Sequence, residues 1–376
     1  MPSRPDPWHF PRPELARQYL EFFETNVSNA LVLFQRRRFG KTEFCLHDLA
    51  PEAEARGYTV AYVSFWQSRL SPAAALLHTI EKSLDKRPLV ERLRHLLTAP
   101  VTKLTLSGEL GGAKAGAEVE LANIPRQPPS DLLIYLGDLI ERAAKKARSK
   151  YLLILDEAQE LAENAANDSL VAALRTILDT NKQTVRVVFT GSSQEGLQRM
   201  FSSRKAPFFH FGTQIDLPQL GEAFVGHIGK AFNAASRRAI DPQALVKTYT
   251  ALGQNPFYLR KLAEVMLVRP DLTIQNALSE LRAKLAVEQG YPRIWESLKP
   301  LDRALLSWLA AGNTQAFTQE ARRYLATRAG LPEVSIQVAQ TAIRRLTKAQ
   351  LVRGLPERGS YSPEDSEFSE WARGHS

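Results

Sequence analysis

Cysteine is scarce in this chain: a single one, Cys45, occurs among 376 residues. One cysteine excludes an internal disulfide framework and a zinc site built from cysteines. Runs of 18 or more apolar residues are also absent, and the opening residues, Met-Pro-Ser-Arg-Pro-Asp-Pro, lack the apolar segment of a secretory signal. We therefore expect a cytoplasmic protein without redox chemistry, in which Cys45 is a small buried apolar residue.

The overall composition is that of a globular protein. Hydrophobic residues make up 44% of the chain, which is enough for ordinary cores, and the length suits two or three domains. The formal net charge is +9, and such a charge favours polyanionic partners. Many basic proteins bind no nucleic acid, so the charge permits a DNA-binding function without establishing one.

The most informative segment reads Gln-Arg-Arg-Arg-Phe-Gly-Lys-Thr and runs from Gln35 to Thr42, directly after the apolar residues 30–34. It fits the phosphate-loop pattern G-x-x-x-x-G-K-[ST] except at Gln35, where the pattern has glycine. In such a loop Gly40 lets the backbone approach the phosphates, Lys41 reaches the β- and γ-phosphates, and the Thr42 hydroxyl ligates Mg²⁺. The segment predicts a nucleoside triphosphate site whose affinity Gln35 weakens mildly.

A second motif, residues 151–157, has the sequence Tyr-Leu-Leu-Ile-Leu-Asp-Glu. Its apolar run predicts a buried strand, at whose end Asp156 can hold a metal ion and Glu157 can orient or deprotonate a water molecule. The alternative, an ordinary solvated strand end, is less favoured because the phosphate loop lies upstream. Together the two motifs predict a nucleoside triphosphatase.

A third strand candidate, residues 185–190, ends in Gly191-Ser192-Ser193. Ser192 or Ser193 can hydrogen-bond the γ-phosphate or the attacking water, although a plain turn explains either serine equally well. In a doubly wound sheet ligands bind beyond the carboxyl ends of the strands. The loops after residues 34, 155 and 190 should therefore converge on one crevice.

Strand and helix candidates alternate along the first part of the chain, which predicts an α/β fold with a parallel sheet. Further strands are predicted at residues 58–66 and 208–217, and a β-hairpin insertion near 101–121 interrupts the alternation. From residue 220 to 285 the pattern is almost wholly helical.

The last part of the chain predicts a winged helix-turn-helix: helices at residues 298–311, 317–330 and 335–350, then two short strands around a turn. Polar residues on the third helix and in the turn suit contacts to DNA grooves and phosphates. The DNA-binding candidates are Gln340, Arg344, Arg345, Lys348 and Arg358. Docking of a protein partner stays open, because the local excess of positive charge is modest and an acidic segment at 364–367 dilutes it.

Taken in order, residues 37–42, 155–159, 190–193 and the Gly-Gln-Asn-Pro-Phe turn at 253–257 resemble the archaeal-type ATPases, which belong to the STAND and AAA+ class of P-loop proteins. The entry segment at residues 10–15 is similar to the lead-in of that family. The resemblance implies a P-loop (AAA+-like) core at 1–218, a helical lid at 219–290 and a winged-helix domain at 291–376.

The resemblance also implies roles for individual residues. Lys41, Thr42 and Asp156 would bind phosphate and Mg²⁺, Glu157 would be the catalytic base, and Arg260 a sensor-like arginine. Gln159 and Ser192 or Ser193 would sense the γ-phosphate, and the turn at Pro256 would belong to the lid. The implied nucleotide site comprises Gln35, Arg36, Arg37, Arg38, Phe39, Gly40, Lys41, Thr42, Glu43, Asp156, Gln159 and Pro256. The arginine that the family commonly has before the fifth strand is missing, which leaves Arg199 or Arg204 as candidates for an arginine finger.

Three functions fit these expectations. The first is an ATP-driven, Mg²⁺-dependent switch that acts on duplex DNA or on a protein partner and forms homo-oligomers with nucleotide. The second is a nucleotide-binding regulator or scaffold with little turnover. The third is a loader of the replication-initiator kind.

Overall fold

The structure is a computed structural model, and it describes residues 6–67, 71–84, 89, 129–148, 150–202, 206–355 and 357–375. These residues form two compact units. The described residues within 11–35 and 41–217 form the α/β unit, and those within 1–10, 36–40 and 218–376 form the helical unit. The hairpin predicted near 101–121 lies outside the described residues, as does Arg204.

The α/β unit is built on a five-stranded sheet with the order β2-β3-β4-β1-β5, in which every neighbouring pair is parallel. The strands are β1 (Ala30–Phe34), β2 (Thr59–Ser64), β3 (Tyr151–Asp156), β4 (Val185–Gly191) and β5 (Thr213–Asp216). Every residue of β3 is buried, as the apolar run predicts for a central parallel strand. The α/β, P-loop type of sheet expected from the sequence is confirmed.

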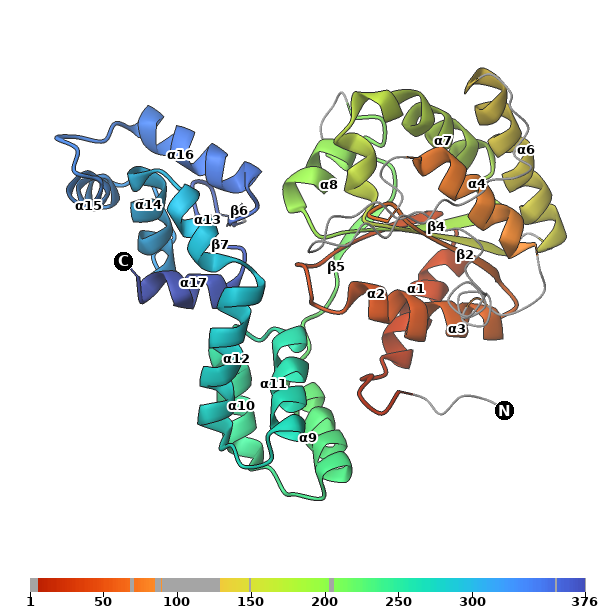
Figure 1. Cartoon of the computed structure of the whole chain (residues 1–376). Coiled ribbons are helices and arrows are strands. Elements are labelled where there is room, and N and C mark those ends of the chain that lie inside the picture. The colour runs from red at the N-terminus through yellow and green to blue at the C-terminus, as the bar shows by residue number, and fades with distance from the viewer. Residues whose placement is uncertain are drawn as a thin grey trace, which may run out of the picture. The chain divides into compact units, whose positions relative to one another are not determined.

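Helices cover both faces of this sheet (Figure 1). The helical segments of the unit are α1 (Pro13–Glu24), α2 (Lys41–Phe44), a π-helical turn (Cys45–Leu49), α3 (Ala50–Ala55), α4 (Pro72–Ser83), α6 (Pro129–Lys146), 3-10 turns at Ala158–Ala162 and Ala165–Asn167, α7 (Asp168–Thr180) and α8 (Gln194–Phe201). Side chains alternate between the two faces, so Leu153 and Leu155 pack toward α4, α6 and α7 while Leu152 and Ile154 pack toward α1 and α3. Cys45 is fully buried among apolar residues, as expected.

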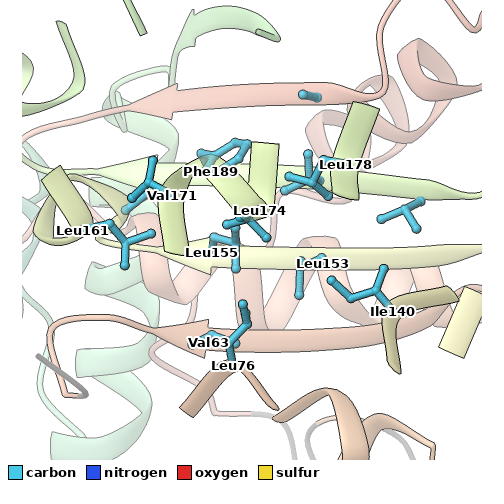
Figure 2. Packing of buried hydrophobic residues seen from close by; sticks show 14 of the residues in the cluster. Val63, Leu76, Ile140, Leu153, Leu155, Leu161, Val171, Leu174, Leu178 and Phe189 are labelled. Carbon is cyan, nitrogen blue, oxygen red and sulfur yellow. The ribbon is translucent and has the colours of Figure 1, made fainter. Parts of the chain in front are cut away.

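Helices α4, α6 and α7 form a layer that packs on the sheet through a continuous apolar core (Figure 2). Leu76 of α4, Ile140 of α6 and Leu174 of α7 are fully buried with the sheet residues beneath them. Truncation of such a leucine to alanine typically costs about 2–5 kcal/mol, because the cavity collapses only in part. The sheet edge that carries the motifs is therefore held rigidly from one side by three packed helices.

The fifth strand is shorter than predicted. Residues 208–217 were expected to be extended, but β5 begins at Thr213 and residues 207–210 form a turn. His210 and Gly212 both have positive φ, which departs from the extended backbone of a regular strand. Phe208 and Phe211 are still buried, because they pack around Phe189 of β4 rather than within a strand. Their apolar character reflects this aromatic cluster.

After residue 218, the helical unit contains four helices, and a C-terminal part that begins at Tyr291 follows them. Its elements are α9 (Glu222–Ser236), α10 (Pro242–Ala251), α11 (Pro256–Val268), α12 (Ile274–Glu288), α13 (Tyr291–Ser297), α14 (Pro300–Ala310), α15 (Gln319–Ala329), α16 (Ile336–Lys348), β6 (Val352–Gly354), β7 (Tyr361–Pro363) and α17 (Ser366–Arg373). Side chains of Asp241, Asn255, Thr273 and Ser335 cap the N-termini of four of these helices.

The C-terminal part has the expected winged-helix order. Helices α14, α15 and α16 share one apolar core, and the antiparallel pair β6-β7 follows them. Two helices were not predicted, α13 before this part and α17 after it. The division into three domains at residues 218 and 290 stays a prediction.

The acidic segment at 364–367 is part of the folded structure rather than a charged tail. Asp365 caps α17 by accepting hydrogen bonds from the backbone N–H groups of Glu367 and Phe368, at 2.8 and 3.2 Å. Glu367 is buried and pairs with Arg282 of α12 at 2.9 Å. Within the described part of the chain, no helix is long and apolar enough to cross a bilayer.

Candidate nucleotide site

The predicted motifs meet at one edge of the sheet because β3, β4 and β1 are parallel neighbours. Gln35 follows β1, Asp156 ends β3 and Gly191 ends β4. The backbone N–H of Gln35 donates to the carbonyl of Gly191 at 3.5 Å, and its side-chain Nε2 donates to the carbonyl of Leu217 at 2.7 Å. The glutamine that departs from the phosphate-loop pattern thus ties the end of β1 to the segment after β5.

Lys41 begins the helix after the loop and is almost completely buried. Its Nζ donates to the carbonyl of Gln35 at 2.7 Å and lies 4.0 Å from Oε1 of Glu157. Gly40, directly before it, has φ +82°, a conformation that favours glycine. The buried ammonium is therefore held beside a carboxylate at the sheet edge.

Asp156 is the most heavily hydrogen-bonded carboxylate of the site. Its Oδ2 accepts from the Thr42 hydroxyl at 2.9 Å and from the Tyr62 hydroxyl at 2.6 Å. Its Oδ1 accepts from the Thr190 hydroxyl and from the backbone N–H of Glu157 at 3.1 Å. Asp156 is 2% exposed, so these donors replace the water that an ionised carboxylate needs.

Glu157 follows in the left-handed conformation, with φ 54° and ψ 46°, which is uncommon for a residue with a side chain. Its Oε2 accepts from the Gln159 side chain at 2.5 Å, from the Ser192 hydroxyl at 2.6 Å and from the Ser192 N–H at 3.2 Å. Strained backbone conformations are found at functional sites, where surrounding contacts hold them. Ser192 and Gln159 therefore fix the carboxylate that the sequence singled out as the base.

Two glycines leave room for Gln159. A Cβ on Gly191 would lie 2.6 Å from Oε1 of Gln159, and a Cβ on Gly196 would lie 2.7 Å from its Cβ. Oε1 of Gln159 is buried without a hydrogen-bond partner.

Two arginines of the loop, Arg36 and Arg38, contact residues of the helical unit. Arg38 donates to the Tyr258 hydroxyl and to Oε1 of Gln289, both at 3.0 Å, and lies 3.7 Å from Asp365. Arg36 stacks over the ring of Phe39, and burial lowers its pKa, with nearby Arg353 acting in the same direction. Arg37 is exposed. Their predicted part in nucleotide binding stays a prediction.

The other residues of the predicted site have varied surroundings. Glu43 lies 3.7 Å from His47 one turn along the helix. Pro256 is buried at the start of α11, behind the Asn255 cap, whereas Arg260 of α11 pairs with Asp6 at 3.5 Å. Arg199 is exposed on α8.

Four of the five DNA-binding candidates are exposed in the winged helix: Gln340, Arg344, Lys348 and Arg358. Arg345 differs, because its Nε and Nη2 donate to both carboxylate oxygens of the buried Asp302, at 3.0 and 2.5 Å. This bidentate pair raises the pKa of Arg345 and joins α16 to α14. The sequence did not indicate this intramolecular use of Arg345.

The donor set suits Mg²⁺, which prefers oxygen ligands and keeps few protein ligands beside phosphates and water. The hydroxyl of Thr42 and the carboxylate of Asp156 supply two such oxygens side by side. Among the described residues, no group of three or more histidine, cysteine, aspartate or glutamate side chains could hold a metal by itself.

No protein-family model and no curated protein sequence matches the chain. Solved structures do. A Walker-type ATPase of Pyrococcus abyssi aligns with a TM-score of 0.64 and 14% identity over 96% of this chain and 95% of that one. The ORC2 protein of Aeropyrum pernix aligns with a TM-score of 0.54 and 16% identity over 96% and 90% in its ADPNP-ADP complexes, and with 0.52 in its ADP form. The chain therefore shares its fold with this Walker-type ATPase and with the ORC2 protein.

The sequence analysis did not include Tyr62 among the residues of this site. The residue was placed in the second strand, and period-two alternation puts it on the same face as Ser64 at the strand end. Register pairs Ser64 with Asp156 and Tyr62 with Ile154. The sequence did contain a signal for this contact. Tyr62 is a long side chain with a polar tip, and it lies two residues before the end of β2, which neighbours β3.

Proposed function

We propose that this protein is a Mg²⁺-dependent ATPase that works as a molecular switch. The observation that carries the proposal is the pairing of Thr42 with Asp156 at 2.9 Å, beside Lys41 and Glu157. These are the four side chains that nucleoside triphosphate hydrolysis requires: two oxygens for the metal, a cation for the phosphates and a carboxylate for the water. The likeness of the fold to a Walker-type ATPase supports the same activity.

Each side chain has a distinct role in this proposal. Mg²⁺ would neutralise charge on the β- and γ-phosphates, and Thr42 and Asp156 would hold it. Lys41 would leave the Gln35 carbonyl for the phosphates, and Glu157 would position the attacking water and accept its proton. Ser192 and Gln159 would keep the Glu157 carboxylate aimed at that water.

The activity is tested by measuring ATP binding and turnover with Mg²⁺ and with EDTA. We expect Mg²⁺-dependent turnover in the wild-type protein and a large loss of ATP affinity in Lys41→Ala. The matched control is Lys261→Ala, which removes a partly exposed lysine paired with Glu264 on α11. Equal ATP binding by wild type and Lys41→Ala would contradict the proposal.

The winged helix is proposed to bind duplex DNA. The exposed residues Gln340, Arg344 and Lys348 lie on α16, one turn or two apart, and Arg358 lies in the hairpin turn. Such residues contact phosphates and base edges when a helix enters the major groove. Ile336 and Val338 near the start of α16 are 44% and 42% exposed, and this pair favours a protein partner as the second candidate.

The two partners are separated by a mobility-shift titration of duplex DNA over a range of salt concentrations, with and without ATP. DNA binding through lysine and arginine weakens steeply with salt. If the affinity for duplex DNA falls steeply with salt and depends on ATP, the result supports a protein in which ATP controls DNA binding. If no duplex binds even at low salt, a protein partner is favoured. ATP binding without turnover, with or without duplex, would favour the regulator or scaffold over the switch and over an initiator-like loader.

Self-association with ATP belongs to the same proposal. Transition-state charge in this class of reaction is often stabilised by an arginine from a neighbouring molecule. Arg199 is exposed and available for that role. Light scattering with and without a non-hydrolysable ATP analogue tests it, and a mass that nucleotide leaves unchanged would contradict it.

A further inference from the structure

Tyr62 places a phenol on the metal-binding carboxylate of the site. It lies in β2, next to β3, and its hydroxyl donates to Oδ2 of Asp156 at 2.6 Å. The same oxygen accepts the hydrogen bond from Thr42. Tyr62 therefore contacts the oxygen that faces the expected cation position, and it does so from a strand that carries none of the sequence motifs.

The hydrogen bonds to Asp156 are divided evenly between its two oxygens. Oδ1 is held by Thr190 and by the backbone N–H of Glu157, and Oδ2 is held by Thr42 and Tyr62. Thr42 is itself a candidate ligand, so its hydroxyl oxygen would serve the cation as well. Of the two side chains that donate to Oδ2, Tyr62 is the one that is not itself a candidate ligand of the cation. It therefore helps to orient the Asp156 carboxylate without binding the metal.

The phenol of Tyr62 donates its proton to Oδ2 of Asp156 in a short hydrogen bond of 2.6 Å. The rigid ring, carried by β2 and packed partly buried beside β3, also restricts the direction from which this donor can act.

We infer that Tyr62 is a positioning residue for the nucleotide-associated divalent cation, acting through Asp156. The inference rests on the proposed function, because the cation accompanies the nucleotide. Outer-shell partners of metal-ligating side chains typically change metal affinity by about 10–100-fold when they are removed. Removal of the Tyr62 hydroxyl leaves Oδ2 with Thr42 as its side-chain donor, so this oxygen is held less firmly toward the cation position.

The test is Tyr62→Phe, which removes one oxygen and keeps the ring. A fluorescent ATP analogue is titrated in EDTA and over a series of Mg²⁺ concentrations, and the turnover of ATP is followed over the same series. In EDTA, we expect the affinity for the analogue to be unchanged. The Mg²⁺ concentration that gives half of the maximal change in analogue binding, and half of the maximal turnover, should rise about 10-fold or more. The KM for ATP at saturating Mg²⁺ should stay near the wild-type value.

The matched control is Tyr58→Phe. Tyr58 directly precedes β2, is buried where Tyr62 is partly buried, and carries the Lys150 ammonium 5.6 Å above its ring. Its substitution should leave the Mg²⁺ dependence unchanged. Thermal unfolding of both variants, together with analogue binding in EDTA, shows whether the site is folded.

Equal Mg²⁺ dependence in wild type and Tyr62→Phe would overturn the inference, as would an equal shift in Tyr58→Phe. Failure of the proposed function has a different signature, because it appears in the wild-type protein. If the wild type binds the analogue without hydrolysing ATP, the Mg²⁺ dependence of binding still decides the role of Tyr62.

Discussion

Gly191 offers the sharpest test of how tightly the site is packed. It ends β4, and its missing side chain leaves space for Gln159 and Leu197. A Cβ at this position would lie 2.6 Å from Oε1 of Gln159 and 2.8 Å from both Cγ and Cδ2 of Leu197. Both neighbours are buried, so Gly191→Ala forces at least one of them to move.

The structure sets the size of the effect. Adding a methyl group to a packed interior typically costs about 1–3 kcal/mol of unfolding free energy. Gln159 also donates to Glu157 at 2.5 Å, and a hydrogen bond to a charged group contributes about 1.5–3 kcal/mol. If Gly191→Ala displaces the Gln159 amide from the carboxylate, turnover should fall roughly 10- to 100-fold.

Urea denaturation and ATP turnover measure the two effects on the same samples. The control is Gly226→Ala in α9, where an added Cβ meets nothing within 4 Å. Alanine in an open helical position should raise stability by about 0.5–1 kcal/mol and leave turnover unchanged. Wild-type stability together with wild-type turnover in Gly191→Ala would refute the packing argument.

Three further predictions concern the helical unit. Arg345→Ala leaves the buried Asp302 without its partner. In urea denaturation the variant should lose about 1–3 kcal/mol of unfolding free energy, a range discounted because the arginine is partly exposed. An unchanged midpoint would show that the pair does not stabilise the protein. Arg344→Ala and Lys348→Ala should leave stability within about 0.5 kcal/mol, yet each should reduce the salt slope of duplex binding by about 1; an unaltered slope would remove α16 from the DNA interface. Burial raises the pKa of Glu367, so the folded protein holds this proton more tightly than the unfolded chain, and stability should fall as pH rises through the raised pKa. Glu367→Gln should remove that fall, and an identical pH profile would contradict this.

Much of the core could be predicted because its signals are local. The apolar runs of β1, β3 and β4 are long and bounded by motif residues, and a parallel arrangement brings their ends together. The sequence predicted those three strands and the meeting of Lys41, Asp156 and Glu157 at one edge.

Other features depend on tertiary contacts that no local pattern encodes. The run from Phe208 to Leu217 resembles a strand, but its phenylalanines belong to a cluster around Phe189 and the backbone turns at His210. Arg345 resembles a DNA contact until Asp302 of another helix is placed beside it. Neither outcome follows from periodicity, because each depends on a partner distant in sequence.

The departure at Gln35 has a similar origin. Its side chain bonds to the carbonyl of Leu217, which lies 182 residues along the chain. A pattern match registers only that glycine is missing. The geometry shows that a glutamine here joins two strand ends while its own carbonyl accepts from Lys41.

The most direct test of the central claim compares ATP binding and turnover in the wild-type protein and Glu157→Gln with saturating Mg²⁺. The amide keeps the size of the side chain and removes the charge that accepts a proton. The account predicts wild-type ATP affinity and a loss of turnover of about 10²–10⁴-fold in the variant. Turnover in Glu157→Gln equal to that of the wild type, or a wild-type protein that does not bind ATP, would contradict it.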